Sequence, residues 1–349
     1  MRIGLVCPYD LSTPGGVQQV TSELAERLRL LGDHVVYVAA GRYAYRGGPG
    51  YDKDTIATGR PTRIRANESM VPLTLAPTAW WRVRRALRDV DVIHVHEPLI
   101  PLVGWAALTV GRPTVATFHA DTPGWVEILY RWAPLIDRRM RQAVLTAVSE
   151  SASRAIPGEW GEVHLVPNAL DVSTYDLPVG RIDRRIAFLG RDDPRKGLDV
   201  LLDAWPAIRT KVPQAELLVM GADRSLELQG VEFVGRVSAG EKKRLLAASG
   251  IFVAPNLSGE SFGMVVLEGM AAGCAVVASD LEAFVAVVKD AGLTFPVGDS
   301  SALADEVVGL LLDPAKARRL GDRARVRSKA FDWTEVVTEY RALYETALS

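Results

Sequence analysis

The chain has 349 residues, of which 48% are hydrophobic and 24% are charged, and its formal net charge is −1. This balance is typical of a globular protein, and it excludes a disordered chain or one that binds nucleic acid through global positive charge. Because a domain usually contains roughly 100 to 200 residues, the length predicts two domains, with room for a cleft between them.

Cysteine content and hydropathy both indicate a cytoplasmic protein. Cys7 and Cys274 are the only cysteines, and we expect them in different domains, so neither a disulfide framework nor a cysteine metal site is predicted. Residues 1–8 lack the apolar run of a secretory signal. The longest uncharged stretches, residues 98–111 and 245–259, fall short of the roughly 20 residues of a membrane span. Peripheral contact with a membrane stays open.

The first half of the sequence alternates short β-rich apolar runs with helical patterns. A strand at residues 3–7, a helix at 17–31 and a strand at 35–39 make a βαβ start. Further strands are predicted at residues 92–95, 114–118, 144–148 and 163–166. Helix-length segments separate most of them, which indicates a parallel sheet covered on both faces. Residues 41–61 have no clear period and predict a surface loop, either a connector or a lid.

The second half repeats this alternation after a turn-rich segment at residues 167–185, which we interpret as the linker. Strands are predicted at residues 186–189, 216–220, 231–234, 251–254, 275–278 and 293–296. Residues 333–348 have the pattern of one amphipathic helix. We therefore expect an α/β protein with two Rossmann-like parallel-sheet domains, at residues 1–170 and 171–332.

Two glycine-containing turns between a strand and a helix could hold phosphate. Gly15 and Gly16 precede the first helix, whose terminal N–H groups and partial positive charge attract anions, although a tight turn explains them equally well. After the strand at residues 186–189 comes a loop with three cations, Arg191, Arg195 and Lys196. Cations at the carboxyl end of a strand favour anion capture in an α/β crevice, and a solvated loop is the alternative.

Two glutamates eight positions apart frame the turn into a later helix. Glu260 lies in the loop, where it could accept hydrogen bonds from sugar hydroxyls, and Phe262, Gly263 and Met264 could hold a diphosphate on their N–H groups. Glu268 interrupts an apolar helix, and burying its carboxylate is costly unless partners satisfy it. A ribose diol would satisfy it, and so would an internal cap or salt bridge.

At these residues the chain resembles the family-four glycosyltransferases of GT-B fold, and most closely the actinobacterial phosphatidylinositol mannosyltransferases. The resemblance covers nearly the whole length. The positions that carry it are Tyr9 and residues 14–18, 94–98, 116–119, 166–168, 191–197, 260–268 and 278–280.

The resemblance implies a retaining, metal-independent transferase that moves mannose from GDP-mannose to a lipid such as phosphatidylinositol at the inner face of the plasma membrane. No cofactor and no nucleic-acid partner are implied. Arg191 and Lys196 would neutralise the departing diphosphate, and Gly16, beside Gly15, would approach it from the other domain. The helix near the end of the chain, residues 333–349, would cross back onto the first domain.

The resemblance also assigns residues to the sugar, the ribose and the acceptor. His119 and Glu260 would hold the transferring sugar, and Glu268 would hold the ribose of the nucleotide. Tyr9 and Gln18 would face the polar head of the acceptor. The residues implied in catalysis are thus His119, Arg191, Lys196 and Glu260.

The sequence departs from the mannosyltransferases near the expected acceptor site. The loop from Arg191 to Lys196 is one residue shorter, residues 120–124 read Ala-Asp-Thr-Pro-Gly where a stretch rich in Ser and Thr is usual, and Leu99 replaces a polar residue. A different donor sugar with a soluble acceptor therefore stays open. Two further alternatives are a sugar-nucleotide epimerase or phosphorylase of the same fold, and a nucleotide-sugar binding protein derived from a transferase. Nothing suggests the pyridoxal phosphate site of a phosphorylase, and the intact set of Arg191, Lys196, His119 and Glu260 argues against a pure binding protein.

Two constellations imitate metal sites. Asp89 and Asp91 form an Asp-x-Asp pair, but they precede their strand, and we interpret them as a surface turn. His94 and His96 share one face of that strand and, with Glu97, could be taken for a set of metal ligands. No fourth ligand is evident, so structural histidines are favoured and no metal is expected.

Residues 78–88 predict a basic amphipathic helix that could bind a membrane. Trp80, Val83 and Leu87 fall on one face, and Trp81 with several arginines falls on or near the other. Trp favours the headgroup level and Arg is attracted to anionic lipid, although a solvated basic helix is the alternative. The candidate membrane-binding residues are Trp80, Trp81, Arg82, Arg84, Arg85 and Arg88.

Overall fold

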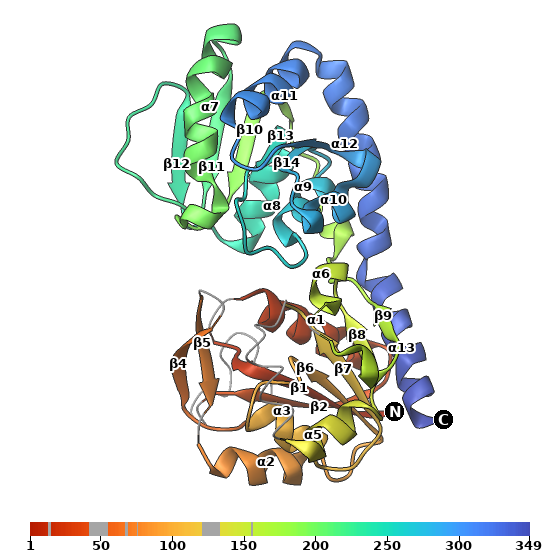
Figure 1. Ribbon diagram of the computed structural model, residues 1–349. Coiled ribbons are helices and arrows are strands. Elements are labelled where there is room, and N and C mark those ends of the chain that lie inside the picture. Colours follow the sequence, from red (N-terminus) through yellow and green to blue (C-terminus); the bar gives the residue numbers. More distant parts are fainter. Residues whose placement is uncertain (13–14, 42–54, 67–68, 75, 121–132, 155) are drawn as a thin grey trace. The chain divides into compact units, whose positions relative to one another are not determined.

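The computed structural model describes the chain except for residues 13–14, 42–54, 67–68, 75, 121–132 and 155 (Figure 1). The chain divides into two compact units. The first contains Met1–Ala169 together with Trp333–Ser349, and the second contains Leu170–Asp332. The residues at the end of the chain thus belong to the first unit.

The first unit is built on a sheet with the strand order β3-β2-β1-β6-β7-β8-β9, in which all neighbours are parallel. These strands are β1 (Arg2–Asp10), β2 (His34–Ala40), β3 (Thr55–Ala57), β6 (Val92–His96), β7 (Thr114–Phe118), β8 (Val144–Ala147) and β9 (Val163–Leu165). An antiparallel pair, β4 (Pro61–Ala66) and β5 (Ser69–Thr74), joins β1 where Leu73 pairs with Tyr9.

Helices cover this sheet because its central strands are buried along their length. The helices are α1 (Gly16–Leu30), α2 (Thr78–Ala86), α3 (Val103–Leu108), α5 (Pro134–Met140), α6 (Glu150–Ser153) and α13 (Trp333–Leu348). Trp333, Tyr340 and Tyr344 of α13 are buried in one hydrophobic cluster with β1 and α1. Trp333 Nε1 also donates a hydrogen bond to Glu23 Oε2 on α1 (2.6 Å). Helix α13 therefore completes the core of the first unit.

The second unit is built on a wholly parallel sheet with the order β12-β11-β10-β13-β14-β15. The strands are β10 (Ile182–Leu189), β11 (Glu216–Met220), β12 (Val231–Gly235), β13 (Ser249–Ala254), β14 (Ala275–Ser279) and β15 (Leu293–Phe295). The helices are α7 (Leu198–Lys211), α8 (Ala239–Ala247), α9 (Met264–Ala271), α10 (Glu282–Val288), α11 (Ser300–Leu312) and α12 (Pro314–Ser328). Among the described residues, no helix is both long and apolar enough to cross a bilayer.

The predicted strands and the helix at residues 333–348 are confirmed, but one strand begins earlier than predicted and three short strands were not predicted. Strand β10 begins at Ile182, inside the predicted linker, because Ile182 pairs with Ser249 of β13. The hairpin of β4 and β5 was not predicted, and neither was β3, which lies within the segment interpreted as a loop at residues 41–61. Residues 42–54 of that segment lie outside the described residues.

Two short segments where the chain passes between the units are bonded to each other within the second unit. Leu170 N donates to Phe331 O (2.9 Å), and Val172 N donates to Asp332 Oδ2 (3.1 Å). A 3-10 helix, η3 (Val172–Tyr175), follows directly and packs against α8 and α9. The segment where the chain enters the second unit is therefore hydrogen-bonded to the segment where it leaves that unit.

The turn between η4 (Pro194–Lys196) and α7 depends on a glycine. Gly197 has φ 66°, and a Cβ atom there would lie 1.8 Å from the carbonyl oxygen of Pro255. We predict that Gly197→Ala lowers the free energy of unfolding in urea by about 2 kcal/mol or more, because the left-handed conformation and the backbone contact both oppose a side chain.

Gly240 provides the matched control for this substitution. It lies in α8, and a Cβ atom there would have no neighbour within 4 Å. Gly240→Ala should leave stability unchanged or raise it by up to about 1 kcal/mol. Equal unfolding curves for the two variants would contradict the prediction.

Candidate active site

The loop after β10 carries two ionised groups that neutralise each other. Arg195 donates from its backbone N and its guanidinium to Asp193, with the closest contact between Arg195 Nη2 and Asp193 Oδ2 (2.7 Å). These hydrogen bonds hold the pKa of Asp193 at about 2. Arg191 is exposed, and no hydrogen bond or ion pair of its guanidinium occurs within the described part of the chain. Of the three cations in this loop, Arg191 and Lys196 are therefore the candidates for an anion.

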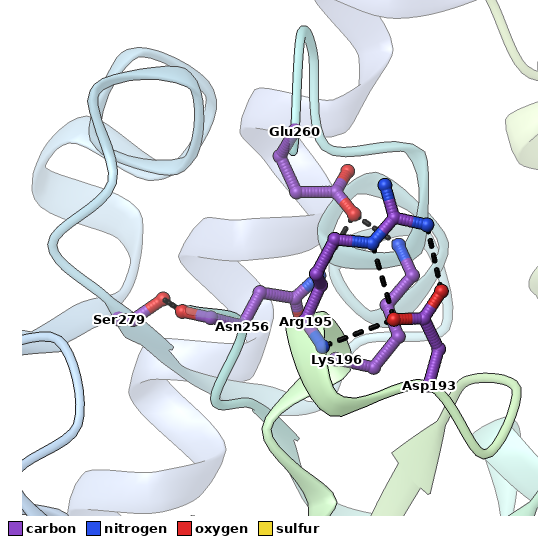
Figure 2. Close-up of polar contacts among 6 residues, drawn as sticks. All are labelled: Asp193, Arg195, Lys196, Asn256, Glu260 and Ser279. Atoms are coloured by element: carbon purple, nitrogen blue, oxygen red, sulfur yellow. Dashed lines mark hydrogen bonds and ion pairs between the residues drawn. The ribbon is translucent and has the colours of Figure 1, made fainter. Parts of the chain in front are cut away.

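Lys196 and Glu260 form an ion pair, so the structure brings two of the predicted residues together (Figure 2). Asn256 Nδ2 donates to the same oxygen, Glu260 Oε1 (2.8 Å). The backbone at Asn256 is itself fixed, because its main-chain carbonyl oxygen accepts a hydrogen bond from Ser279 Oγ (2.7 Å). Glu260 Oε2 has no partner among the described residues and is left to accept hydrogen bonds from a ligand.

In the turn before α9, backbone N–H groups are available to a ligand, whereas the side chain of Phe262 is buried. Gly263 has φ 104° and precedes the first helical residue, Met264. Phe262 is buried, with its ring packed edge-on against Phe331 at 5.8 Å between centroids. The first N–H groups of a helix have no partner within the helix, so those of the first turn of α9 can bind an anion.

Glu268 is buried on α9, and one of its carboxylate oxygens is paired within the protein. Lys242 Nζ on α8 lies 2.6 Å from Glu268 Oε1, and Tyr175 Oη donates to the same oxygen (3.0 Å). The salt bridge that the sequence left open is thus present. It occupies one oxygen only, because no partner of Oε2 is found in the residues that the structure describes.

In the first unit, His119 follows β7 and contacts a second histidine. His96 Nδ1 and His119 Nε2 are 2.7 Å apart, so one ring donates and the other accepts. Burial lowers the pKa of His119 to about 4 and that of His96 well below its usual value. Both rings are therefore neutral at pH 7, and His119 can contact a ligand only as a neutral hydrogen-bonding group.

Glu97 holds the backbone at His119. His119 N donates to Glu97 Oε1 (3.0 Å), and burial raises the pKa of the Glu97 carboxyl to about 7. Glu97 also has φ 49°, a conformation that is uncommon for a residue with a side chain. Sequence reasoning considered Glu97 only as a metal ligand. Its position directly after a buried strand was the signal for a role at the strand's carboxyl end.

His94 connects β6 to helix α13. Its Nδ1 is 2.8 Å from Tyr344 Oη and its Nε2 is 2.6 Å from Thr117 Oγ1. Thr117 Oγ1 contacts Thr146 Oγ1 (2.5 Å), which donates to the carbonyl oxygen of Ala116 (3.4 Å). A carbonyl only accepts, so this last bond sets the direction of the others. Tyr344 donates to His94, His94 donates to Thr117, and Thr117 donates to Thr146. His94 is a structural histidine, as the sequence favoured.

The glycine turn before α1 also lies in the first unit. Helix α1 begins at Gly16, which is exposed, and a Cβ atom on Gly15 would lie 2.4 Å from Gln18 Oε1. Gln18 is half-buried on the first turn of α1. Tyr9, near the end of β1, is half-buried, and desolvation raises its pKa well above its usual value. These residues lie at the carboxyl end of β1, where ligands of α/β sheets bind.

Helix α2 forms where a basic amphipathic helix was predicted. Trp81 is 72% exposed, and Arg85 and Arg88 are also exposed. Arg84 is half-buried, and its Nη1 donates to Thr109 Oγ1 (2.8 Å) and to the Thr109 carbonyl. The remaining candidates, Trp80 and Arg82, are half-buried.

Asp89 and Asp91 occupy a turn before β6, as predicted. Asp91 Oδ2 accepts from Arg2 N (2.7 Å), and Asp89 pairs with Arg88 at the surface (3.4 Å). No group of three or more His, Cys, Asp or Glu side chains with the arrangement of metal ligands occurs in the ranges that the structure covers.

Sequence and structure comparisons place this chain among known proteins. A model described as Glycosyltransferase Family 4 matches residues 14–174, and one described as Glycosyl transferases group 1 matches residues 183–313. The phosphatidyl-myo-inositol mannosyltransferase of Mycolicibacterium smegmatis is 36% identical over 99% of this chain and 94% of its own length. That of Propionibacterium freudenreichii is 33% identical over 99% and 95%.

Solved structures share the fold at lower identity. HepE of Anabaena, solved with UDP and glucose, has a TM-score of 0.76 and 20% identity, over 99% of this chain and 100% of its own. Sucrose-phosphate synthase of Thermosynechococcus elongatus has a TM-score of 0.72 and 21% identity, over 99% and 98%. With two parallel-sheet units and these matches along its length, the chain belongs to the family 4 glycosyltransferases of GT-B fold.

Proposed function

We propose that this glycosyltransferase moves mannose from GDP-mannose to phosphatidylinositol at the surface of a membrane, with retention of configuration and without a metal ion. Binding of the sugar donor is supported by the cluster of Lys196, Glu260 and Asn256 at the carboxyl ends of β10 and β13. The choice of mannose as the sugar and of phosphatidylinositol as the acceptor is supported by the names of relatives that are 33–36% identical over nearly their whole length.

The donor's diphosphate leaves as negative charge, which fixed cations stabilise most effectively. Lys196 and Arg191 supply that charge, and the N–H groups at the start of α9 add to it. As the bond from the anomeric carbon to the diphosphate breaks, the acceptor oxygen bonds to that carbon from the same face. The acceptor's proton passes to the diphosphate, so no protein carboxylate is needed as a nucleophile.

The remaining site residues hold the other parts of the reactants. Glu260 Oε2 accepts from hydroxyls of the transferring sugar, and neutral His119 provides a further hydrogen bond. Glu268 accepts from the ribose, while Gly16 lets the backbone approach the diphosphate. Tyr9 and Gln18 contact the polar head of the acceptor. These assignments follow the family pattern at matching positions.

A transfer assay tests the proposal directly. We expect radiolabelled mannose to pass from GDP-mannose to phosphatidylinositol in vesicles, with EDTA present, and UDP-glucose to be a poor donor. GDP at 100 times its Kd should also stabilise the protein by about 2.7 kcal/mol. Transfer only to a soluble acceptor would overturn the lipid assignment, and loss of activity in EDTA with rescue by Mg²⁺ would overturn the metal-independent one.

Removing either of the two cations assigned to the diphosphate should slow the chemical step. We predict that Arg191→Ala and Lys196→Ala each lower kcat by about two orders of magnitude, the scale for loss of one electrostatic group at developing charge. Lys196→Ala should be the more severe, because it also removes the partner of Glu260.

Arg184 and Lys211 are matched controls for these two substitutions. Arg184 lies on β10 and pairs with Glu216, and Lys211 ends α7 with its side chain 60% exposed. Their Ala variants should retain the wild-type kcat in steady-state assays. Normal turnover of both cation variants at saturating donor would contradict the assigned roles.

The membrane assignment predicts binding through the exposed face of α2. We expect cosedimentation with vesicles of anionic lipid and none with zwitterionic lipid, weakening as salt rises, because each Arg near an anionic surface contributes about 1 kcal/mol. The double variant Arg85→Ser and Arg88→Ser, or Trp81→Ser, should lose this binding and still bind GDP. Arg84→Ser is the control, since Arg84 bonds to Thr109 and should contribute less.

A further inference from the structure

The carboxylate of Glu268 is held asymmetrically. Lys242 Nζ and Tyr175 Oη both contact Oε1, at 2.6 and 3.0 Å, and Glu268 is 5% exposed. A carboxylate oxygen has two lone pairs in its plane, so these two donors occupy Oε1. Both lone pairs of Oε2 are available, because none of the described residues donates a hydrogen bond to it.

Tyr175 is itself fixed before any ligand binds. Its side chain is 1% exposed, and Lys243 Nζ lies 5.1 Å from the centre of its ring. Lys243 Nζ also donates to Thr174 Oγ1 (2.7 Å), which ties the neighbouring residue to α8. Helix η3, which carries Tyr175, is fixed at its first residue by Asp332. The phenol therefore approaches Glu268 from a rigid support.

Tyr175 lies outside the motifs that mark the site in the sequence. The segment at residues 167–185 was interpreted as a linker, and nothing in it pointed to a ligand. The fold nevertheless sets its phenol against a carboxylate 93 positions later in the chain. A buried hydrogen bond to an ionised group is strong and directional, so it can orient the group that receives it.

We propose that Tyr175 is a positioning residue for nucleotide recognition. With Lys242, it holds Oε1 of Glu268 so that Oε2 is presented to the ribose hydroxyls of the donor. This inference rests on the proposed function, in which Glu268 holds the ribose of a nucleoside diphosphate sugar. It adds that selectivity for the ribose diol depends on the phenol of Tyr175, which lies five residues after the start of the second unit at Leu170.

Tyr175→Phe tests the proposal because it removes one hydroxyl and keeps the ring. Binding of GDP, 2′-deoxy-GDP and 3′-deoxy-GDP is measured by calorimetry for both proteins. The wild type should prefer GDP over the deoxy nucleotides by about tenfold or more, the scale of a hydrogen bond to a charged group. The variant should bind GDP about five- to tenfold more weakly and each deoxy nucleotide within about twofold of the wild type. Its KM for the donor should rise while kcat stays within about twofold.

Two further variants separate positioning from a structural role. Tyr37→Phe removes another buried phenol hydroxyl, which bonds to Thr21 Oγ1 (2.7 Å) in the first unit, and should leave the preference for GDP unchanged. Lys242→Met removes the other donor to Oε1 and should reduce the preference as Tyr175→Phe does, which keeps the test valid if Tyr175→Phe is poorly folded.

The outcomes also separate this inference from the proposed function. If the wild type prefers GDP and the preference persists in Tyr175→Phe and Lys242→Met, positioning by Tyr175 is wrong and the donor assignment stands. If the wild type binds GDP and its deoxy forms equally, the ribose role of Glu268 fails, and the inference fails with it. If the wild type binds none of GDP, UDP or ADP, the proposed function itself is overturned.

Discussion

The loops that follow β10 and β13 touch through their backbones, and the charged groups of the second unit depend on this contact. Leu257 N donates to Arg195 O (2.7 Å), and only a residue without a side chain fits at Gly197 against Pro255. Lys196 precedes that glycine and Glu260 follows Leu257 closely, so their ion pair follows from the backbone arrangement. Because neighbouring parallel strands end at the same edge, the fold gathers these groups before a ligand arrives.

Glu260 and Glu268 show how one carboxylate can serve both structure and binding. Each gives Oε1 to a lysine and one further donor, and neither Oε2 has a hydrogen-bond partner among the described residues, so each could serve a ligand in the proposed function. The protein meets the cost of desolvating the anion with internal partners, and these partners also fix its orientation. The three buried histidines of the first unit are neutral instead, since burial keeps His94, His96 and His119 uncharged. His94 thus connects β6 to α13 through hydrogen bonds between neutral groups.

The sequence was sufficient for the two parallel sheets except β3, and for the loops after their strands, because apolar runs of strand length and glycine turns are local signals. It could not predict which residues meet across the chain. Tyr175 reaches Glu268, Asn256 reaches Glu260, and Arg84 turns away from solvent to Thr109. Each contact depends on packing between elements, and helical periodicity alone does not show that Arg84 bonds to Thr109. The short strands β3, β4 and β5 were missed because their sequences are polar or mixed.

The position of α13 in the chain has a consequence for how the protein is made. Domains commonly fold as they leave the ribosome, beginning with the N-terminal one. Here the first unit lacks Trp333, Tyr340 and Tyr344 of its core until residues 170–332 have been synthesised. At about 5–20 residues per second, that interval lasts on the order of ten seconds. During it, the apolar surface of β1 and α1 is uncovered and His94 lacks its tyrosine. The second unit can complete its fold first, and the nascent first unit is the part that needs protection from aggregation.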